Sequence, residues 1–229
     1  MLLPLEHGFV MEDDPHFPLG GDAVALAHDA AASLAPGARV CDLGCGAGGV
    51  SLLLAAARAD LSVTGVELRP GAARLARENV RKNRAEDRIR IVGGDLRAVR
   101  TLFPPASFDA AAANPPYRAV SEGKLPAHPD DAAARTETTA SLADFCAAAA
   151  YLLPHGGEFT LCYPVSRLAR LFSALTAVSL EPKYLTLLYP DAAHAPAVLV
   201  CRARKGARPG LAAAPPVFTA HPESRRSAP

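Results

Sequence analysis

The chain has 229 residues, of which 50% are hydrophobic and 21% are charged, and its formal net charge is +1. This composition excludes a wholly disordered chain, which has fewer apolar residues and a larger net charge. No apolar run approaches the roughly 18 residues of a membrane-spanning helix, and the acidic N-terminus does not resemble a secretory signal, so we expect one cytoplasmic domain without a membrane partner.

Apolar runs and turn residues predict strands and helices that alternate along the chain. Short runs that end at glycine, proline or acidic residues indicate strands, and longer segments rich in alanine and leucine indicate helices. The predicted strands cover residues 39–43, 61–66, 88–92, 108–113 and 158–163, and the predicted helices cover residues 50–59, 70–83, 138–153 and 165–178. Two last strands, 183–189 and 197–202, have no helix between them, and we expect them to be antiparallel.

This alternation predicts an α/β fold. We expect a mostly parallel sheet of seven strands, with helices on both faces and an antiparallel C-terminal strand. The domain is expected to span residues 36–206, between an N-terminal segment (1–35) and a C-terminal arm with a flexible tail (207–229). Ligands of such sheets bind at the carboxyl ends of the strands, near the first turn from strand to helix.

A glycine-rich loop, residues 44–49, connects the first predicted strand to the first predicted helix. Glycines there let the backbone turn tightly and approach a ligand. Glu67 ends the second strand, where an acid can accept hydrogen bonds from both ribose hydroxyls, and Asp95 ends the third, where it can contact an adenine edge. The alternatives are a solvent-facing loop acid for Glu67 and a helix N-cap ahead of Leu96 for Asp95. The pattern predicts an adenosine-containing cofactor and leaves NAD, FAD and other nucleosides open.

The tetrapeptide Asn114-Pro115-Pro116-Tyr117 ends the fourth predicted strand. Its prolines remove two backbone donors, so nearby carbonyls stay unpaired, and Asn114 adds a side-chain acceptor. Tyr117 offers a ring on which a planar group can stack. These features suit a planar amino group such as adenine N6 or a carboxamide, because paired acceptors stabilise positive charge as it develops on nitrogen. The alternative is a plain turn after a strand.

The pattern from Asp42 through Gly44, Gly46 and Gly48, followed by Asn-Pro-Pro-Tyr, resembles the class I methyltransferases. The resemblance implies their Rossmann-like fold and S-adenosyl-L-methionine as the cofactor. It implies that the glycine loop holds the methionine part, that Asp42 orders the loop or binds the amino group, and that Glu67 binds the ribose. The expected cofactor-binding residues are Asp22, Asp42, Gly44, Gly46, Gly48, Glu67, Leu68, Asp95, Leu96 and Asn114, and the expected catalytic residues are Asn114, Pro115, Pro116 and Tyr117.

Segments outside these motifs are similar to one subfamily, the adenine-N6 methyltransferases that act on valine tRNA. They are residues 17–27, 134–142 and 198–216. The resemblance implies methyl transfer to adenine N6 with an RNA partner, tRNA, and an N-terminal segment beside the cofactor. The chain departs from the family's usual pattern at 16–18 and at Arg118. Alternatives are guanine N2 in ribosomal RNA, a protein glutamine side chain and, outside methyltransferases, an NAD-dependent oxidoreductase.

Five cysteines are widely scattered, and no histidine cluster accompanies them. We therefore expect buried apolar thiols, with no disulfide framework and no metal site.

Two basic segments, 74–100 and 202–208, are candidate contacts for RNA phosphates, as are Arg118, Lys124 and Arg135 in the loop after Tyr117. The alternative is that these bases lie on ordinary solvated faces and loops.

Overall fold

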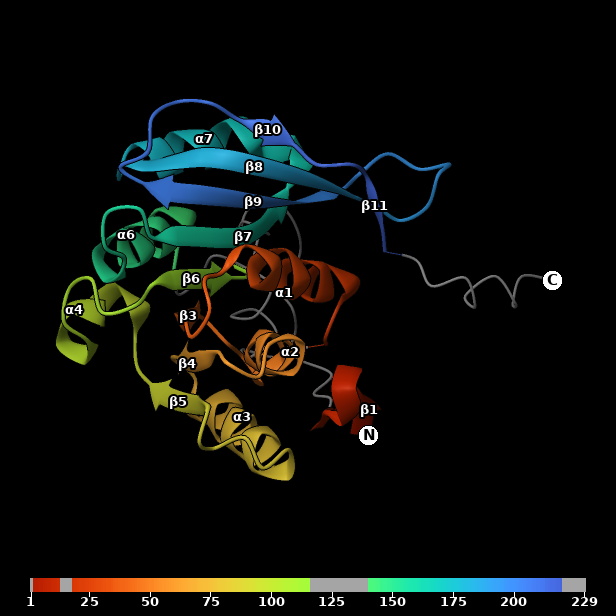
Figure 1. Cartoon of the computed structure of the whole chain (residues 1–229), viewed down its shortest axis with the longest axis vertical. Coiled ribbons are helices and arrows are strands. Elements are labelled where there is room, and N and C mark those ends of the chain that lie inside the picture. Colours follow the sequence, from red (N-terminus) through yellow and green to blue (C-terminus); the bar gives the residue numbers. More distant parts are fainter. Residues whose placement is uncertain (1, 13–17, 116–139, 220–229) are drawn as a thin grey trace, which may run out of the picture.

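The computed structural model describes residues 2–12, 18–115 and 140–219. At its centre, seven long strands lie in the order β5-β4-β3-β6-β7-β9-β8, and two short strands pair with the outer edge of β8 (Figure 1). The bounds are Arg39–Leu43 for β3, Ser62–Glu67 for β4, Ile89–Gly93 for β5, Ala110–Ala113 for β6, Glu158–Pro164 for β7, Leu180–Tyr189 for β8, Val198–Lys205 for β9, Ala212–Ala213 for β10 and Val217–Phe218 for β11.

The strand directions confirm the predicted α/β architecture. Strands β5, β4, β3, β6 and β7 are parallel, and β9 lies antiparallel between β7 and β8. The predicted count of seven strands is too low, because the sheet also contains β10 and β11. These belong to the predicted C-terminal arm, where the backbone amides of Ala214 and Thr219 donate to the carbonyls of Leu185 and Tyr189, each over 2.8 Å.

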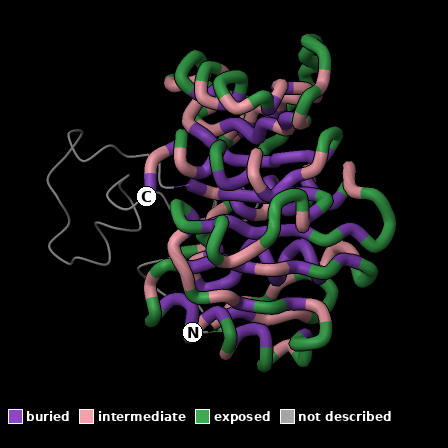
Figure 2. Tube along the Cα trace, turned by 90° about the vertical axis from the view of Figure 1, so that its left-hand side faces the viewer, coloured by how far each residue is buried: buried purple, intermediate pink, exposed green. Residues whose placement is uncertain are grey.

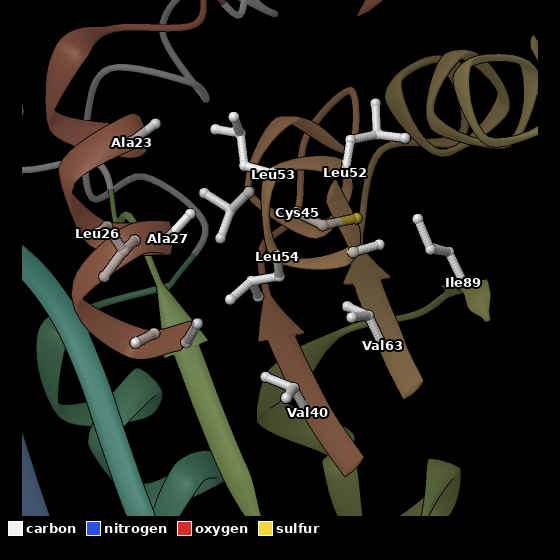
Figure 3. Close-up of a cluster of buried hydrophobic side chains, with 14 of the residues drawn as sticks. Ala23, Leu26, Ala27, Val40, Cys45, Leu52, Leu53, Leu54, Val63 and Ile89 are labelled. Carbon is white, nitrogen blue, oxygen red and sulfur yellow. The ribbon is translucent and has the colours of Figure 1, made fainter. Parts of the chain in front are cut away.

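Helices cover both faces of the sheet, and successive side chains of β3 pack beneath different helices. Val40 belongs to the core beneath α1, α2 and α3, whereas Cys41 and Leu43 belong to the core beneath α6 and α7. Figure 2 shows the buried stretches within the layers, and Figure 3 shows the first core between α1, α2 and β3 to β5. The helices are α1 (Gly21–Ser33), α2 (Gly49–Ala57), α3 (Pro70–Lys82), α4 (Val99–Leu102), α6 (Leu142–Leu152) and α7 (Leu168–Thr176), with short 3-10 turns η1 (Glu6–Gly8), η2 (Leu96–Ala98) and η4 (Val165–Arg167).

An N-terminal hairpin of β1 (Leu2–Pro4) and β2 (Val10–Glu12) packs on α3. Two asparagine side chains on α3 take the place of a neighbouring strand. The amide of Asn79 accepts from the backbone of Glu12 over 2.8 Å, and the amide of Asn83 accepts from the backbone of Val10 over 2.7 Å. The hairpin is therefore fixed by hydrogen bonds to residues about 70 positions later in the chain.

All five cysteines are free and buried, as the sequence predicts, and burial raises the pKa of each thiol. Within the described ranges, no group of three or more histidine, cysteine or acidic side chains is arranged to hold a metal ion. None of the described helices combines the length and the apolar character needed to span a membrane.

Candidate active site

The glycine loop joins β3 to α2 at the carboxyl end of the sheet. Gly44, Gly46 and Gly48 all have positive φ angles, of 72°, 56° and 90°. The backbone amides of Gly44 and Cys45 donate to the carbonyl of Val66, over 2.9 and 3.0 Å, so the loop is tied to the end of β4. A side chain at Gly46 would meet no atom of the described chain within 4 Å, which leaves this part of the loop open to a ligand.

Glu67, at the end of β4, is buried and holds the loop. One carboxylate oxygen accepts from the backbone amide of Gly46 over 2.9 Å, and the other accepts from the backbone amide and Nε of Arg69, over 2.9 and 3.1 Å. This excludes the alternative of a solvent-facing loop acid. The next residue, Leu68, is 40% exposed and adds an apolar side chain to the same edge.

Asp42 is buried one residue before the end of β3. Its Oδ2 accepts from the hydroxyl of Ser51 on α2 over 2.7 Å. Desolvation is the main cause that raises the pKa of Asp42 to about 6, and the nearby negative charge of Glu67 raises it further, against the lowering effect of Ser51. Asp42 therefore fixes the start of α2, and the two roles implied by the resemblance, ordering the loop and binding the amino group, stay predictions.

Asp95 and Leu96 follow β5. Asp95 caps η2, because its side chain accepts from the backbone amide of Arg97 over 2.9 Å. The guanidinium of Arg97 also pairs with both carboxylate oxygens and is the main cause that lowers the pKa of Asp95. The N-cap alternative is thus confirmed, while Leu96 is buried in the core beneath α6. An adenine contact by Asp95 stays a prediction.

Asn114 lies immediately after β6, two residues beyond the pair formed by Asp42 and Ala112, and therefore beside the start of the glycine loop. Its Nδ2 donates to Oδ2 of Asp22, in the first turn of α1, over 3.4 Å. Its Oδ1 is buried and has no hydrogen-bond partner in the described structure. A buried acceptor without a partner is rare and calls for an explanation, and a hydrogen bond from a bound amino group supplies one. Pro115 is buried next to it.

Several predicted residues lie outside the described residues. They are Pro116, Tyr117, Arg118, Lys124 and Arg135. The two basic segments are described, and two of their cations are engaged within the protein. Arg97 pairs with Asp95, and the Nζ of Lys205 donates to the carbonyls of Ala150 and Leu153, over 2.5 and 2.7 Å. Contact between these segments and RNA phosphates stays a prediction.

Sequence reasoning missed Asn79 as a residue of the site. This fully buried side chain donates to the carbonyl of Ala47 in the glycine loop over 3.0 Å and also holds β2. The available signal was an asparagine on the otherwise apolar face of a helix, with a second one four residues later at Asn83. Asn79 therefore couples the N-terminal hairpin to the loop.

Comparisons with known proteins agree with this arrangement. The family model of the methyltransferase small domain matches residues 25–184. Among solved structures, a predicted O-methyltransferase from Agrobacterium tumefaciens has a TM-score of 0.69 at 22% identity and covers 91% of this chain and 92% of its own. TrmN from Thermus thermophilus has a TM-score of 0.54 at 26% identity, over 80% of this chain and 48% of its own.

Curated relatives carry one name, tRNA1(Val) (adenine(37)-N6)-methyltransferase. The relative from Shewanella sp. (strain MR-4) is 32% identical over 71% of this chain and 67% of its own length. The relative from Porphyromonas gingivalis (strain W83) is 33% identical over 68% and 63%. The match thus spans about two thirds of these relatives. Because the family model covers well over half of the sequence, the chain belongs to the methyltransferase small-domain family.

Proposed function

We propose that this protein transfers a methyl group from S-adenosyl-L-methionine to the N6 amino group of an adenine in tRNA. One observation supports this most strongly: Oδ1 of Asn114 is a buried acceptor without a partner in the described structure, at the carboxyl edge of the sheet beside the glycine loop. The names of the curated relatives point to the same reaction and substrate. The reaction takes place where tRNA is found, in the cytoplasm.

The residues around the loop fit the cofactor. The open space at Gly46 and the exposed side chain of Leu68 leave room for it. Oε2 of Glu67 accepts from the amide of Gly46 and has a second lone pair that suits a ribose hydroxyl. Asp42, Gly44 and Gly48 shape the loop that would hold its methionine part. When bound, the cofactor supplies an activated methyl group.

Asn114 acts on the amine that receives the methyl group. The lone pair of an adenine amino group is delocalised into the ring, so the group is a weak nucleophile. Oδ1 of Asn114 accepts a hydrogen bond from this amine and stabilises the positive charge that grows on nitrogen during transfer. The carbonyl of Pro115 is the second acceptor, as expected from a motif whose prolines leave carbonyls unpaired. After the transfer, the positively charged amine is acidic and releases its proton to water, so no strong general base is required. The remaining requirement is alignment of the amine with the methyl group.

Asp22 keeps the Asn114 amide in the useful orientation. An amide can present either its oxygen or its nitrogen to the substrate, and only the oxygen accepts a hydrogen bond. The carboxylate of Asp22 is an acceptor, so it selects the orientation in which Nδ2 faces α1 and Oδ1 faces away. Asp22 is therefore a positioning residue, whereas the resemblance implies a contact with the cofactor.

The test is to map methylated nucleosides by mass spectrometry after incubation with the methyl donor and separate pools of tRNA, ribosomal RNA and release factor. The proposal predicts N6-methyladenosine in tRNA alone. N2-methylguanosine in ribosomal RNA or methylglutamine in protein would replace it with one of the alternative methyl acceptors. Binding of a nicotinamide dinucleotide, without binding of the methyl donor, would support an oxidoreductase.

A further inference from the structure

The C-terminal arm runs along the edge strand β8 and ends at the carboxyl edge of the sheet. β10 pairs with Tyr184 and Leu185, and β11 pairs with Leu188 and Tyr189, both in parallel register. Since β9 is antiparallel to both β7 and β8, strand β8 points the same way as β6 and β7. Its end therefore lies at the edge that carries Asn114, and Figure 1 shows β11 beside it.

Direct contacts link the end of the arm to the candidate active site. The backbone amide of Thr219 donates to the carbonyl of Tyr189 over 2.8 Å. A side chain at Gly21 would place its Cβ 3.2 Å from the Cβ of Thr219, so the arm packs against the first turn of α1 where a glycine allows a close approach. The next residue, Asp22, holds the Asn114 amide. One helical turn thus contacts both the arm and the catalytic side chain.

The arm presents a fixed aromatic surface at this place. Phe218 is 53% exposed and Val217 is 39% exposed, although both lie in a strand whose backbone is paired with β8. The rings of Phe218 and Tyr189 have centroids 5.8 Å apart. Val217 and Phe218 are consecutive in the strand, so their side chains point to opposite sides, and the aromatic surface consists of Phe218 and Tyr189.

The two rings are tilted by 50°, so Tyr189 supports Phe218 from the side and does not extend its plane. We infer that the ring of Phe218, held in place by Tyr189, is a stacking platform for an unpaired RNA base that neighbours the target adenine. This inference rests on the proposed function. A base that leaves its stack to enter an active site separates from its neighbours, which then need another stacking surface. Aromatic side chains provide one for any base.

The charges near the end of β8 favour a base over a phosphate as the occupant, because Asp191, two residues beyond Tyr189 and paired with His194 over 2.8 Å, carries a carboxylate that repels phosphates. Arg202 Nε lies 2.8 Å from Asp29 Oδ1 as an ion pair, and the guanidinium of Arg202 stacks over Tyr184 at 4.3 Å. Lys183 donates to the carbonyl of Arg208 over 3.0 Å. These cations, which lie toward the start of β8, are engaged within the protein, and the aromatic pair is the exposed feature described at the end of the arm.

The experiment compares three substitutions of Phe218 in the full chain with a matched control. Phe218→Ala removes the ring, Phe218→Leu keeps an apolar side chain without a ring, and Phe218→Trp keeps an aromatic face. The control is Leu211→Ala, because Leu211 is 46% exposed on the same arm but lies near the start of β8, away from the site. Binding to a tRNA transcript is measured by fluorescence anisotropy, methyl transfer by its KM and kcat, and cofactor affinity by calorimetry.

Stacking predicts that Phe218→Ala and Phe218→Leu each raise the Kd for tRNA by about 5-fold to 100-fold, with kcat and cofactor affinity within about twofold of wild type. Phe218→Trp should restore binding, and Leu211→Ala should leave it unchanged. Unchanged tRNA binding by Phe218→Ala overturns the platform, as does full binding by Phe218→Leu, because an apolar contact without a ring would then suffice. A wild-type protein that binds tRNA without methylating it refutes the proposed function alone, and one that binds no RNA refutes both.

Discussion

Replacing Asp22 with asparagine tests the proposed role of Asp22 on α1 in orienting the amide of Asn114. The carboxylate accepts from Nδ2 of Asn114 over 3.4 Å, and an amide in its place can act as donor or acceptor. In the Asp22→Asn variant the Asn114 amide has no preferred orientation. Roughly half of the molecules would then present Nδ2 instead of Oδ1 to the amine, which lowers the rate about twofold. The carboxylate also stabilises the charge that develops on the amine. For about half a charge at about 7 Å and an effective dielectric constant near 20, this contribution is about 1 kcal/mol.

Together these effects predict a fall in kcat of roughly tenfold for Asp22→Asn, with cofactor affinity unchanged. Single-turnover methyl transfer measures the first quantity, and calorimetry with the cofactor measures the second. Asp29→Asn is the matched control, because Asp29 lies two turns further along α1 and interacts with Thr186 and Arg202 instead. It should change stability without changing kcat.

The reasoning about Asp22 is wrong if the variant keeps wild-type kcat. It is also wrong if cofactor affinity and kcat fall together, because that outcome assigns Asp22 to the cofactor, as the resemblance implies.

Three further substitutions test the surroundings of the loop. Glu67→Gln should weaken cofactor binding by about 5-fold to 100-fold in calorimetry, since bonds to a carboxylate are about twice as strong as neutral ones, and a change below twofold contradicts the ribose assignment. For Asp42, the raised pKa of about 6 means that the folded state binds its proton more tightly than the unfolded state, so the residue's contribution to stability falls as pH rises from about 4 to 6. The measured quantity is the difference between the unfolding free energies of wild type and Asp42→Asn. It should fall by about 3 kcal/mol over this window and stay constant above pH 7. A difference that does not change with pH refutes the raised pKa of Asp42. Asn79→Ala leaves the buried partners of this amide unpaired, so it should destabilise the protein by about 2–4 kcal/mol in denaturant titrations and also weaken cofactor binding. The control Asn83→Ala should destabilise the protein without changing cofactor affinity.

Local sequence signals predicted the elements that build the site. Residues 39–43 form a strand with the predicted bounds, and Pro70 begins a helix as expected, because proline fits the first turn. The glycine loop and the place of Glu67 at the end of the second strand follow from the same kind of signal, a short motif placed by alternating elements, whereas the burial of Glu67 came only from the structure.

Contacts between distant residues could not be predicted in this way. Asp22 and Asn114 are separated by 92 positions, and the N-terminal hairpin depends on asparagine amides of α3 rather than on its own pattern. The strands β10 and β11 contain two residues each, too few for any periodicity, and they form because β8 offers an unpaired edge. At Asp95 the sequence left two roles open, and only the position of Arg97 showed that the cap is formed.

The central claim is that Oδ1 of Asn114 activates the amine. Its most direct test is single-turnover methyl transfer to tRNA by Asn114→Ala, together with the cofactor Kd of the same variant. The account predicts a rate loss of about 100-fold or more, comparable to the removal of one group that stabilises charge in a transition state, with cofactor Kd within about twofold of wild type. A variant that retains wild-type turnover, or that loses cofactor affinity as strongly as rate, contradicts it.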